Sequence, residues 1–254
     1  MGWDDVGARG VRAISAGAIS GGSTSGGAIG VVGARGGVGA STLAAALARR
    51  LARHGPTCLV DLEHAGGGLD VLVGLEDSTG LRWPDLADAR GAVAGDELAA
   101  LLPRWGSCAV LSADRTRPGP PPADAVADVL SALAPHHAHV VIDLDRADVL
   151  ARGPGLAACR TTLVLVPRDL RGVAGVLALR AAILGVVPDV RLVVRGPAPG
   201  GLGVLELAHV VDLPVAASMG PDRRIAAAVE RGAGPSTRRG PLARAVASLA
   251  RELA

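Results

Sequence analysis

The residues of this chain that most clearly indicate a chemical function form one glycine-rich run. This run lies between an apolar stretch and an Ala/Leu-rich stretch. The run is Gly33-Ala34-Arg35-Gly36-Gly37-Val38-Gly39-Ala40-Ser41-Thr42. Glycines permit positive φ angles and close approach of the backbone, and free N–H groups at the start of a helix attract anions. The run therefore predicts a strand–loop–helix that cradles a phosphate, with the Ser41 hydroxyl placed for Mg²⁺ and Thr42 beside it.

Two classes of nucleotide-binding protein fit this loop. Gly33, Gly37 and Gly39 match the GxxxGxG spacing of short-chain dehydrogenases. Asp61 lies where such an enzyme would hold the ribose of NAD. That family requires a catalytic tyrosine and a catalytic lysine, and the chain contains neither residue type. The dehydrogenase interpretation therefore stays a minor alternative to an ATPase-type phosphate loop.

The ATPase interpretation rests on several motifs that occur in the right order. Residues 35–42 resemble the deviant phosphate loop of the MinD/ParA ATPase family, usually written KGGxGK(S/T), with Arg35 at the signature lysine and Ala40 at the ordinary lysine. Residues 59–63 and 66–75 resemble the second strand and its continuation into the first switch, and residues 140–146 resemble the Walker B strand and second switch. The resemblance covers about residues 28–254, which we expect to form one ATPase-like domain.

The resemblance implies an α/β P-loop NTPase fold with a doubly wound, mostly parallel sheet, and it implies ATP and Mg²⁺ as cofactors. Asp61 and Asp143 would organise Mg²⁺ and its waters together with Ser41, while Glu63 would position the attacking water. Arg35 would reach across a nucleotide-sandwiched homodimer to the partner's phosphates. The residues that would hold the nucleotide are Gly36, Gly37, Val38, Gly39, Ala40, Ser41, Thr42 and Arg195.

Three departures from the family pattern bear on activity. Ala40 removes a charge that neutralises the β- and γ-phosphates, so we expect nucleotide binding to be roughly ten- to hundredfold weaker and ATP hydrolysis to be weak or lost. Glu63 is one methylene longer than the usual aspartate, and misplacement by about 1 Å can cost about a hundredfold in rate. Arg195 replaces an adenine-pocket asparagine without its paired donor and acceptor, which leaves adenine selectivity open.

Within the family, residues 80–86 and 193–197 resemble the CpaE/TadZ branch. That branch implies a dimerising spatial regulator of a Tad-type pilus or secretion ATPase, or of septum-site division machinery, located in the cytoplasm or peripherally at the membrane or cell pole. Two alternatives stay open: a partition-type ATPase that binds DNA non-specifically, and a nucleotide-free scaffold. DNA or a membrane surface would be contacted through residues 221–254, which carry seven arginines against three acidic residues.

Composition removes several other chemistries. All 26 basic residues among the 254 are arginine, and lysine, tyrosine, phenylalanine, asparagine and glutamine are absent. No lysine Schiff base, pyridoxal-phosphate anchor or tyrosine general acid is therefore available. Cys58, Cys108 and Cys159 are odd in number and widely spaced, which favours buried, reduced thiols over a disulfide framework.

The elements that must position these residues follow from hydrophobic periodicity. Short Val/Ile/Leu-rich runs alternate with stretches of helical period, which predicts a βαβα order and a parallel sheet covered on both faces. The predicted strands are 29–33, 57–61, 108–112, 139–143, 162–166, 191–194 and 214–217. The predicted helices are about 40–53, 95–102, 122–134, 170–184, 202–209, 222–231 and 241–253. We expect Asp143 at an exposed strand end, and the apolar stripe of the last helix on the domain's own sheet.

The first residues of the chain have a different character. Residues 1–27 are rich in Gly, Ser and Ala and predict a flexible leader, because such a composition cannot bury enough surface to become ordered. No stretch approaches the roughly 18 consecutive apolar residues of a membrane span, so we expect neither a span nor a signal peptide.

Overall fold

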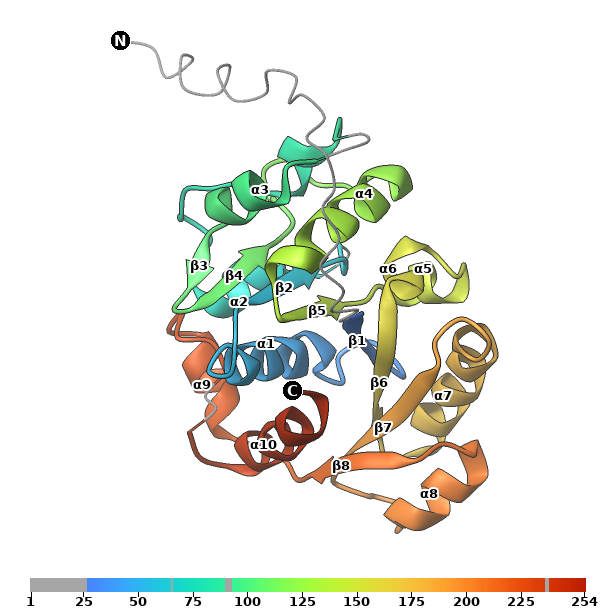
Figure 1. Ribbon diagram of the computed structural model, residues 1–254. Coiled ribbons are helices and arrows are strands. Elements are labelled where there is room, and N and C mark those ends of the chain that lie inside the picture. The colour runs from blue at the N-terminus through green and yellow to red at the C-terminus, as the bar shows by residue number, and fades with distance from the viewer. Residues whose placement is uncertain (1–26, 65, 90–92, 236–237) are drawn as a thin grey trace.

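The computed structural model describes residues 27–64, 66–89, 93–235 and 238–254. The flexible leader expected for residues 1–27 lies outside this part of the chain, apart from Gly27. Figure 1 shows the described residues as a central sheet with helices packed around it.

The sheet has eight strands and is almost entirely parallel. In chain order the strands are β1 (Ala28–Gly33), β2 (Thr57–Asp61), β3 (Arg104–Trp105), β4 (Cys108–Leu111), β5 (His139–Asp143), β6 (Cys159–Pro167), β7 (Asp189–Arg195) and β8 (Val215–Met219). Their spatial order is β3-β4-β2-β5-β1-β6-β7-β8, and only the edge pair β3–β4 is antiparallel. The expected α/β fold with a mostly parallel sheet is confirmed.

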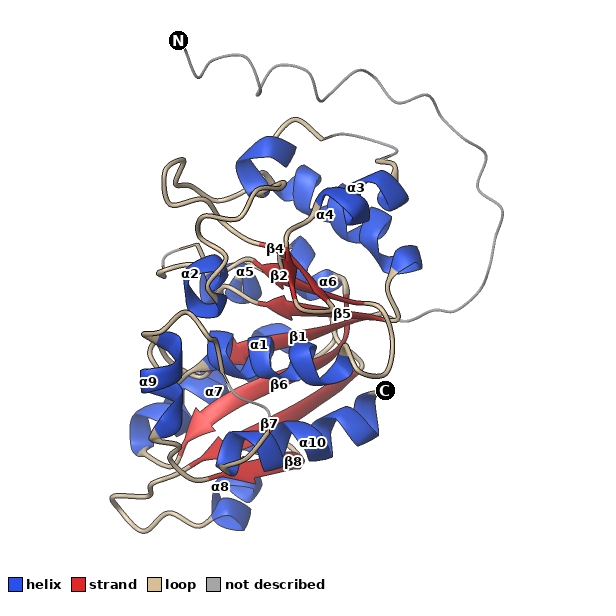
Figure 2. Cartoon of the chain, turned by 90° about the vertical axis from the view of Figure 1, so that its left-hand side faces the viewer, coloured by secondary structure: helices blue, strands red, loops and turns tan. Residues whose placement is uncertain are grey.

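Helices cover both faces of this sheet, as a doubly wound fold requires (Figure 2). They are α1 (Ala40–Leu51), α2 (Leu69–Val73), α3 (Gly95–Leu101), α4 (Ala123–Leu133), α5 (Arg146–Leu150), α6 (Pro154–Ala157), α7 (Leu170–Ile183), α8 (Val204–Val211), α9 (Arg224–Val229) and α10 (Pro241–Leu253), with two short 3₁₀ helices, η1 (Trp83–Leu86) and η2 (Ala134–His136). Helices α1 and α10 pack on one face, and α4, α7 and α8 pack on the other.

The continuous apolar runs of the strands are explained by this two-sided cover. All six residues of β1 are buried. Ile29 and Val31 belong to the apolar cluster under α1 and α10, whereas Val32 belongs to the cluster on the opposite face. Successive side chains of a strand point to opposite faces, so both sets must be apolar when both faces are covered.

All seven predicted strands and all seven predicted helices are present, with strand ends that differ by up to three residues. Four short elements were not predicted from the sequence. They are β3, which has only two residues, and the helices α2, α5 and α6, which have four or five residues. Elements this short span about one helical turn or one pleat, so they produce no periodic pattern to detect.

The last helix packs as expected. Leu242, Val246, Leu249 and Leu253 of α10 are all buried, and α10 lies against α1 and β8. The apolar stripe of α10 therefore belongs to the core. Among the described residues, no helix has the length and apolar character needed to cross a membrane.

Candidate functional site

The glycine-rich loop joins the end of β1 to the start of α1, and its backbone is tight at the base and open at the tip. Gly37 and Gly39 have φ angles of 72° and 95°, which favour glycine. A Cβ added to Gly33 would lie 2.7 Å from Val38 Cγ2, so the base of the turn requires glycine. Cβ atoms added to Gly36 or Gly37 would meet no atom within 4 Å, so the tip has room for a ligand.

Helix α1 begins without a side-chain cap, because its N-cap residue is Gly39. The first N–H groups of α1 therefore have no partner from a capping side chain. Residues 35–42 all border a cavity of about 830 Å³, which we call the phosphate cavity. An anion in this cavity would meet free backbone donors and the positive end of the α1 dipole.

Two aspartates face this loop from the ends of adjacent strands. Asp61 ends β2, Asp143 ends β5, and the two residues are paired in register. Asp61 accepts hydrogen bonds from two backbone N–H groups, that of Glu63 at 3.1 Å and that of Leu69 at 2.8 Å. Ser41 borders the same cavity as Asp143, and its side chain favours the charged form of the Asp143 carboxylate. The structure therefore brings together Ser41, Asp61 and Asp143, the three residues predicted to organise Mg²⁺.

The expectation that Asp143 lies at an exposed strand end is wrong. Its exposed fraction is 1%, and that of Asp61 is 2%. Strand β5 has neighbours on both sides, and Ser41 of α1 lies over the carboxylate. The end of an interior strand is thus covered by the loop and helix that follow β1, and a substitution at Asp143 acts on stability as well as on binding.

Burial perturbs the ionisation of both aspartates. Burial raises the pKa of Asp61 from 3.8 to about 7, because desolvation outweighs the backbone hydrogen bonds from Leu69 and Glu63. Burial also raises the pKa of Asp143 well above 3.8, and the nearby charges of Asp61 and Glu63 raise it further. Two adjacent buried carboxylates are both ionised at low cost only when a cation compensates them.

The donor set fits Mg²⁺. Oδ2 of Asp143 is buried and has no hydrogen-bond partner in the described part of the chain. A carboxylate and a hydroxyl are hard oxygen ligands of the kind Mg²⁺ takes, and Mg²⁺ usually keeps several waters and binds phosphate oxygens as well. Within the described ranges no three His, Cys, Asp or Glu side chains are grouped to hold a metal by themselves. Asp143 and Ser41 would therefore hold Mg²⁺ together with a nucleotide, whose phosphate charge the ion would neutralise.

Arg35, the residue predicted to reach a partner subunit, is engaged within its own chain. Its Nη2 lies 3.0 Å from Oδ2 of Asp169. Asp169 also caps α7 by accepting a hydrogen bond from the Gly172 N–H at 2.7 Å. The hydrogen bond from the Gly172 N–H is the main reason that the pKa of Asp169 lies below its usual value, and the hydrogen bond from Arg35 is the second. Arg35 must therefore leave Asp169 before it can contact a second molecule.

Arg195 lies at the end of β7 and contacts the loop directly. Its Nη1 donates a hydrogen bond to the Val38 carbonyl and is 3.3 Å from the position of a Cβ added to Gly39. Arg195 borders a second cavity of about 320 Å³ on the other side of the loop, which also includes Thr42 and Met219. We call this the base cavity, and Arg195 stands between it and the loop.

Glu63, predicted to position the attacking water, borders the phosphate cavity, and two charged residues of the site were not predicted from the sequence. Asp169 immediately precedes an apolar stretch of helical period, which is a helix N-cap signal that would have identified it. Arg146 borders the phosphate cavity, and its Nε is buried without a hydrogen-bond partner among the described residues. Its place after the Walker B-like strand was visible, but the direction of its side chain was not.

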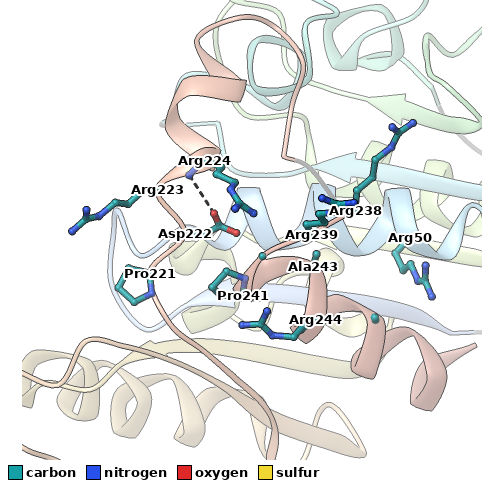
Figure 3. A pocket seen from close by; sticks show the side chains of 12 residues that line it. Arg50, Pro221, Asp222, Arg223, Arg224, Arg238, Arg239, Pro241, Ala243 and Arg244 are labelled. Carbon is teal, nitrogen blue, oxygen red and sulfur yellow. Dashed lines mark hydrogen bonds between the residues drawn. The ribbon is translucent and has the colours of Figure 1, made fainter.

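A separate basic pocket of about 740 Å³ lies where α1, the β8–α9 connection and the start of α10 meet (Figure 3). The charged residues of this arginine pocket are Arg50, Arg223, Arg224, Arg238, Arg239, Arg244 and Asp222. Asp222 accepts a hydrogen bond from the Arg224 backbone N–H at 3.2 Å, and its carboxylate lies against Gly240 at the start of α10. Positive charge therefore exceeds negative charge in this pocket, and Asp222 also borders the base cavity.

The buried aspartate pair makes a prediction about stability and pH. Because folded Asp61 and Asp143 bind protons more tightly than the unfolded chain does, metal-free protein should lose stability as the pH rises from about 4 to 7. Asp143→Asn should reduce this slope by up to about 1.4 kcal/mol per pH unit and should abolish any stabilisation by ATP with Mg²⁺. Urea unfolding at several pH values, with exposed Asp96→Asn as the control, measures the slope. An Asp143→Asn protein that is less stable than the original at pH 8 would contradict the prediction that the ionised Asp143 carboxylate destabilises the metal-free protein.

Comparisons with known proteins find relatives of this chain in sequence and in structure. No family model matches the chain. An uncharacterized protein from Mycobacterium tuberculosis, found in two strains, is 40% identical over 221 residues. The match includes 85% of this chain, which spans only 61% of the length of that relative.

The similar solved structures have low sequence identity but the same architecture. The cell division ATPase MinD from Pyrococcus furiosus has a TM-score of 0.74 at 19% identity, with 90% of this chain and 98% of that chain covered. A ParA family ATPase from Chlorobium tepidum has a TM-score of 0.72 at 16% identity, with the same coverage. The septum site-determining protein MinD from Pyrococcus horikoshii, complexed with Mg-ADP, has a TM-score of 0.67 at 15% identity and covers 89% of this chain and 94% of that chain. This chain therefore has the fold of the MinD and ParA family of phosphate-loop ATPases.

Proposed function

We propose that this protein binds ATP with Mg²⁺ at the phosphate cavity and acts as a nucleotide-responsive, dimerising protein of the MinD/ParA type. The observation that carries the proposal is that Ser41 and the buried carboxylate of Asp143 border one cavity beside the uncapped start of α1. A hydroxyl and a carboxylate on the metal side, with free N–H groups on the phosphate side, complement a metal–phosphate complex. The similarity to a MinD structure that contains Mg-ADP supports this assignment.

Hydrolysis of the bound nucleotide would be slow in this account. Ala40 provides no charge to the phosphates, and Glu63 has a longer side chain than the acid it replaces. The roles we assign are water positioning to Glu63, Mg²⁺ organisation to Asp61 with Asp143, and phosphate contact across a dimer to Arg35. A slow enzyme remains in one nucleotide state for a long time, which suits a regulator that responds to nucleotide binding.

For the cellular role, we propose spatial regulation of a Tad-type pilus or secretion ATPase, or of septum-site machinery, by a CpaE/TadZ-like protein. Two segments that resemble that branch contact the site. In the first, the Trp83 indole N–H donates to the Asp61 carbonyl at 2.5 Å. In the second, Arg195 donates to the Val38 carbonyl. A change of nucleotide at the loop would therefore act on both segments. In this role the protein would work in the cytoplasm or at the membrane periphery.

The test of this function is the response of dimerisation to nucleotide. Arg35→Ala should weaken the dimer formed with a non-hydrolysable ATP analogue by at least about tenfold, because the partner's phosphates lose a charged contact. Nucleotide affinity of the monomer should change by less than about threefold. Sedimentation measures the dimer constant, and fluorescence titration at low protein concentration measures the monomer affinity.

Arg104→Ala removes an exposed arginine at the β3 edge of the sheet and serves as the matched control. Equal losses in both assays would place Arg35 on the nucleotide of its own chain. A dimer of the original protein that ignores nucleotide would contradict the proposed function itself.

A second candidate function, non-specific DNA binding of the partition type, is favoured by the arginine pocket. Six arginines from α1, the start of α9, α10 and the segments that precede α9 and α10 border one cavity with a single carboxylate. Arginine clusters bind phosphate groups, and their affinity for DNA falls steeply with salt because counterions are released. Asp222 borders both this pocket and the base cavity, so the DNA site and the nucleotide site would be adjacent.

Charge reversal on α10 tests this candidate. Arg244→Glu should weaken retention of double-stranded DNA several-fold and lower the salt slope by about 1, because a phosphate contact is lost. Arg251→Glu makes the same charge change on an exposed residue of α10 outside the pocket. Equal effects of the two substitutions would mean that only net charge matters, and salt-insensitive retention would exclude this function.

A further inference from the structure

The phosphate cavity is short of available positive charge. Ala40 contributes none, the guanidinium of Arg35 is paired with Asp169, and Arg146 is the one other basic residue that borders this cavity in the described part of the chain. The same cavity is bordered by four acidic residues: Asp61, Glu63, Asp143 and Asp145. Mg²⁺ would offset part of this charge, but a nucleotide triphosphate is itself strongly anionic. Arg35 and Arg146 do not outnumber these four acids, so a further cation beside the loop would strengthen phosphate binding.

Arg195 is placed to be that cation. Its Nη1 bonds to the Val38 carbonyl and lies over Gly39, the residue directly before Ala40 and the N-cap of α1. The guanidinium is half-buried, and it forms no ion pair with a carboxylate in the part of the chain that the structure describes. One bond to a carbonyl leaves further N–H donors of the guanidinium for a ligand.

The surroundings of Arg195 indicate which part of a nucleotide it would meet. The base cavity beyond Arg195 has several apolar residues, among them Leu72, Met219 and Ile225, which suit the flat face of a base. The phosphate cavity lies on the other side of Val38 and Gly39, which border both cavities. A nucleotide that spans the two would bring the phosphates nearest its sugar to Arg195.

We propose that Arg195 is a phosphate-binding residue that replaces the charge lost at Ala40, an inference that rests on the proposed nucleotide function. The positive charge would then come from the end of β7 and not from the first residue of α1. It would reach the same loop from the other side. A guanidinium donates in a planar fork and can contact a phosphate while it still holds Val38. Phosphate affinity would therefore depend on a residue outside the loop.

A double-mutant cycle with a series of ligands tests this inference. The four proteins are the original, Arg195→Gln, Ala40→Lys and the double variant, titrated calorimetrically with adenosine, AMP, ADP and ATP in the presence of Mg²⁺. The glutamine introduced by Arg195→Gln keeps an amide donor for the Val38 carbonyl but removes the charge. Arg195→Gln should weaken ADP and ATP binding roughly ten- to hundredfold and leave adenosine binding unchanged within about threefold.

The cycle then tests whether a positive charge at position 40 can replace the charge of Arg195 in phosphate binding. Ala40→Lys should restore ADP and ATP binding in the Arg195→Gln background by at least about tenfold, and it should gain clearly less when Arg195 is present. Circular dichroism and thermal unfolding check that each protein is folded. If Arg195→Gln does not fold, Arg195→Lys provides the second test, because the retained charge should keep ATP affinity within about threefold.

The contrary outcomes separate this inference from the function on which it rests. Equal loss of adenosine and ATP binding in the Arg195→Gln protein would make Arg195 a base contact and overturn the inference. Strictly additive effects of the two substitutions, or an Arg195→Lys protein that binds ATP as weakly as the Arg195→Gln protein, would also overturn it. Absence of nucleotide binding by all four proteins would overturn the proposed function and this inference together.

Discussion

The two buried carboxylates of Asp61 and Asp143 impose the condition to which the rest of the site is adapted. The sheet order places β2 beside β5 and β5 beside β1, so both acids end next to the loop that follows β1. Burial opposes their ionisation, and neither can move away without changing the sheet. Free N–H groups at the start of α1 attract an anion, whereas the carboxylates repel one. A complex of a divalent cation with a phosphate satisfies both conditions, and neither component does so alone.

The absence of lysine from the chain changes how positive charge is delivered to such a site. Apart from histidine, every basic side chain is an arginine, whose planar guanidinium presents its donors in a rigid fork. Arg35 is held by Asp169 at the N-terminus of α7, and Arg195 is held by the loop carbonyl of Val38. The first contact links the loop to helix α7, and the second links it to strand β7. Movements of α7 or of the end of β7 would therefore change the conformation of the loop.

Much of the fold and part of the site followed from the sequence. The apolar runs that became β1, β2 and β5 were recognisable because a sheet covered on both faces leaves no polar alternation. The loop, Ser41 and both aspartates were predicted from local motifs, and the structure brings them together. The ion pair between Arg35 and Asp169 joins residues 134 positions apart, and no local pattern encodes it. The burial of Asp143 likewise depends on the strand order, which a single strand does not reveal.

The most direct test of metal-dependent phosphate binding by the loop is amide hydrogen exchange in the unmodified protein. With ATP and Mg²⁺, the backbone N–H groups of residues 37–42 should exchange more slowly than with ATP and a chelator, because they then donate to a phosphate held by the metal. Unchanged exchange in the loop at saturating ATP and Mg²⁺ would show that the loop does not hold a phosphate. Protection confined to residues 221–224 and 238–244 would also contradict it, since the anion would then occupy the arginine pocket instead.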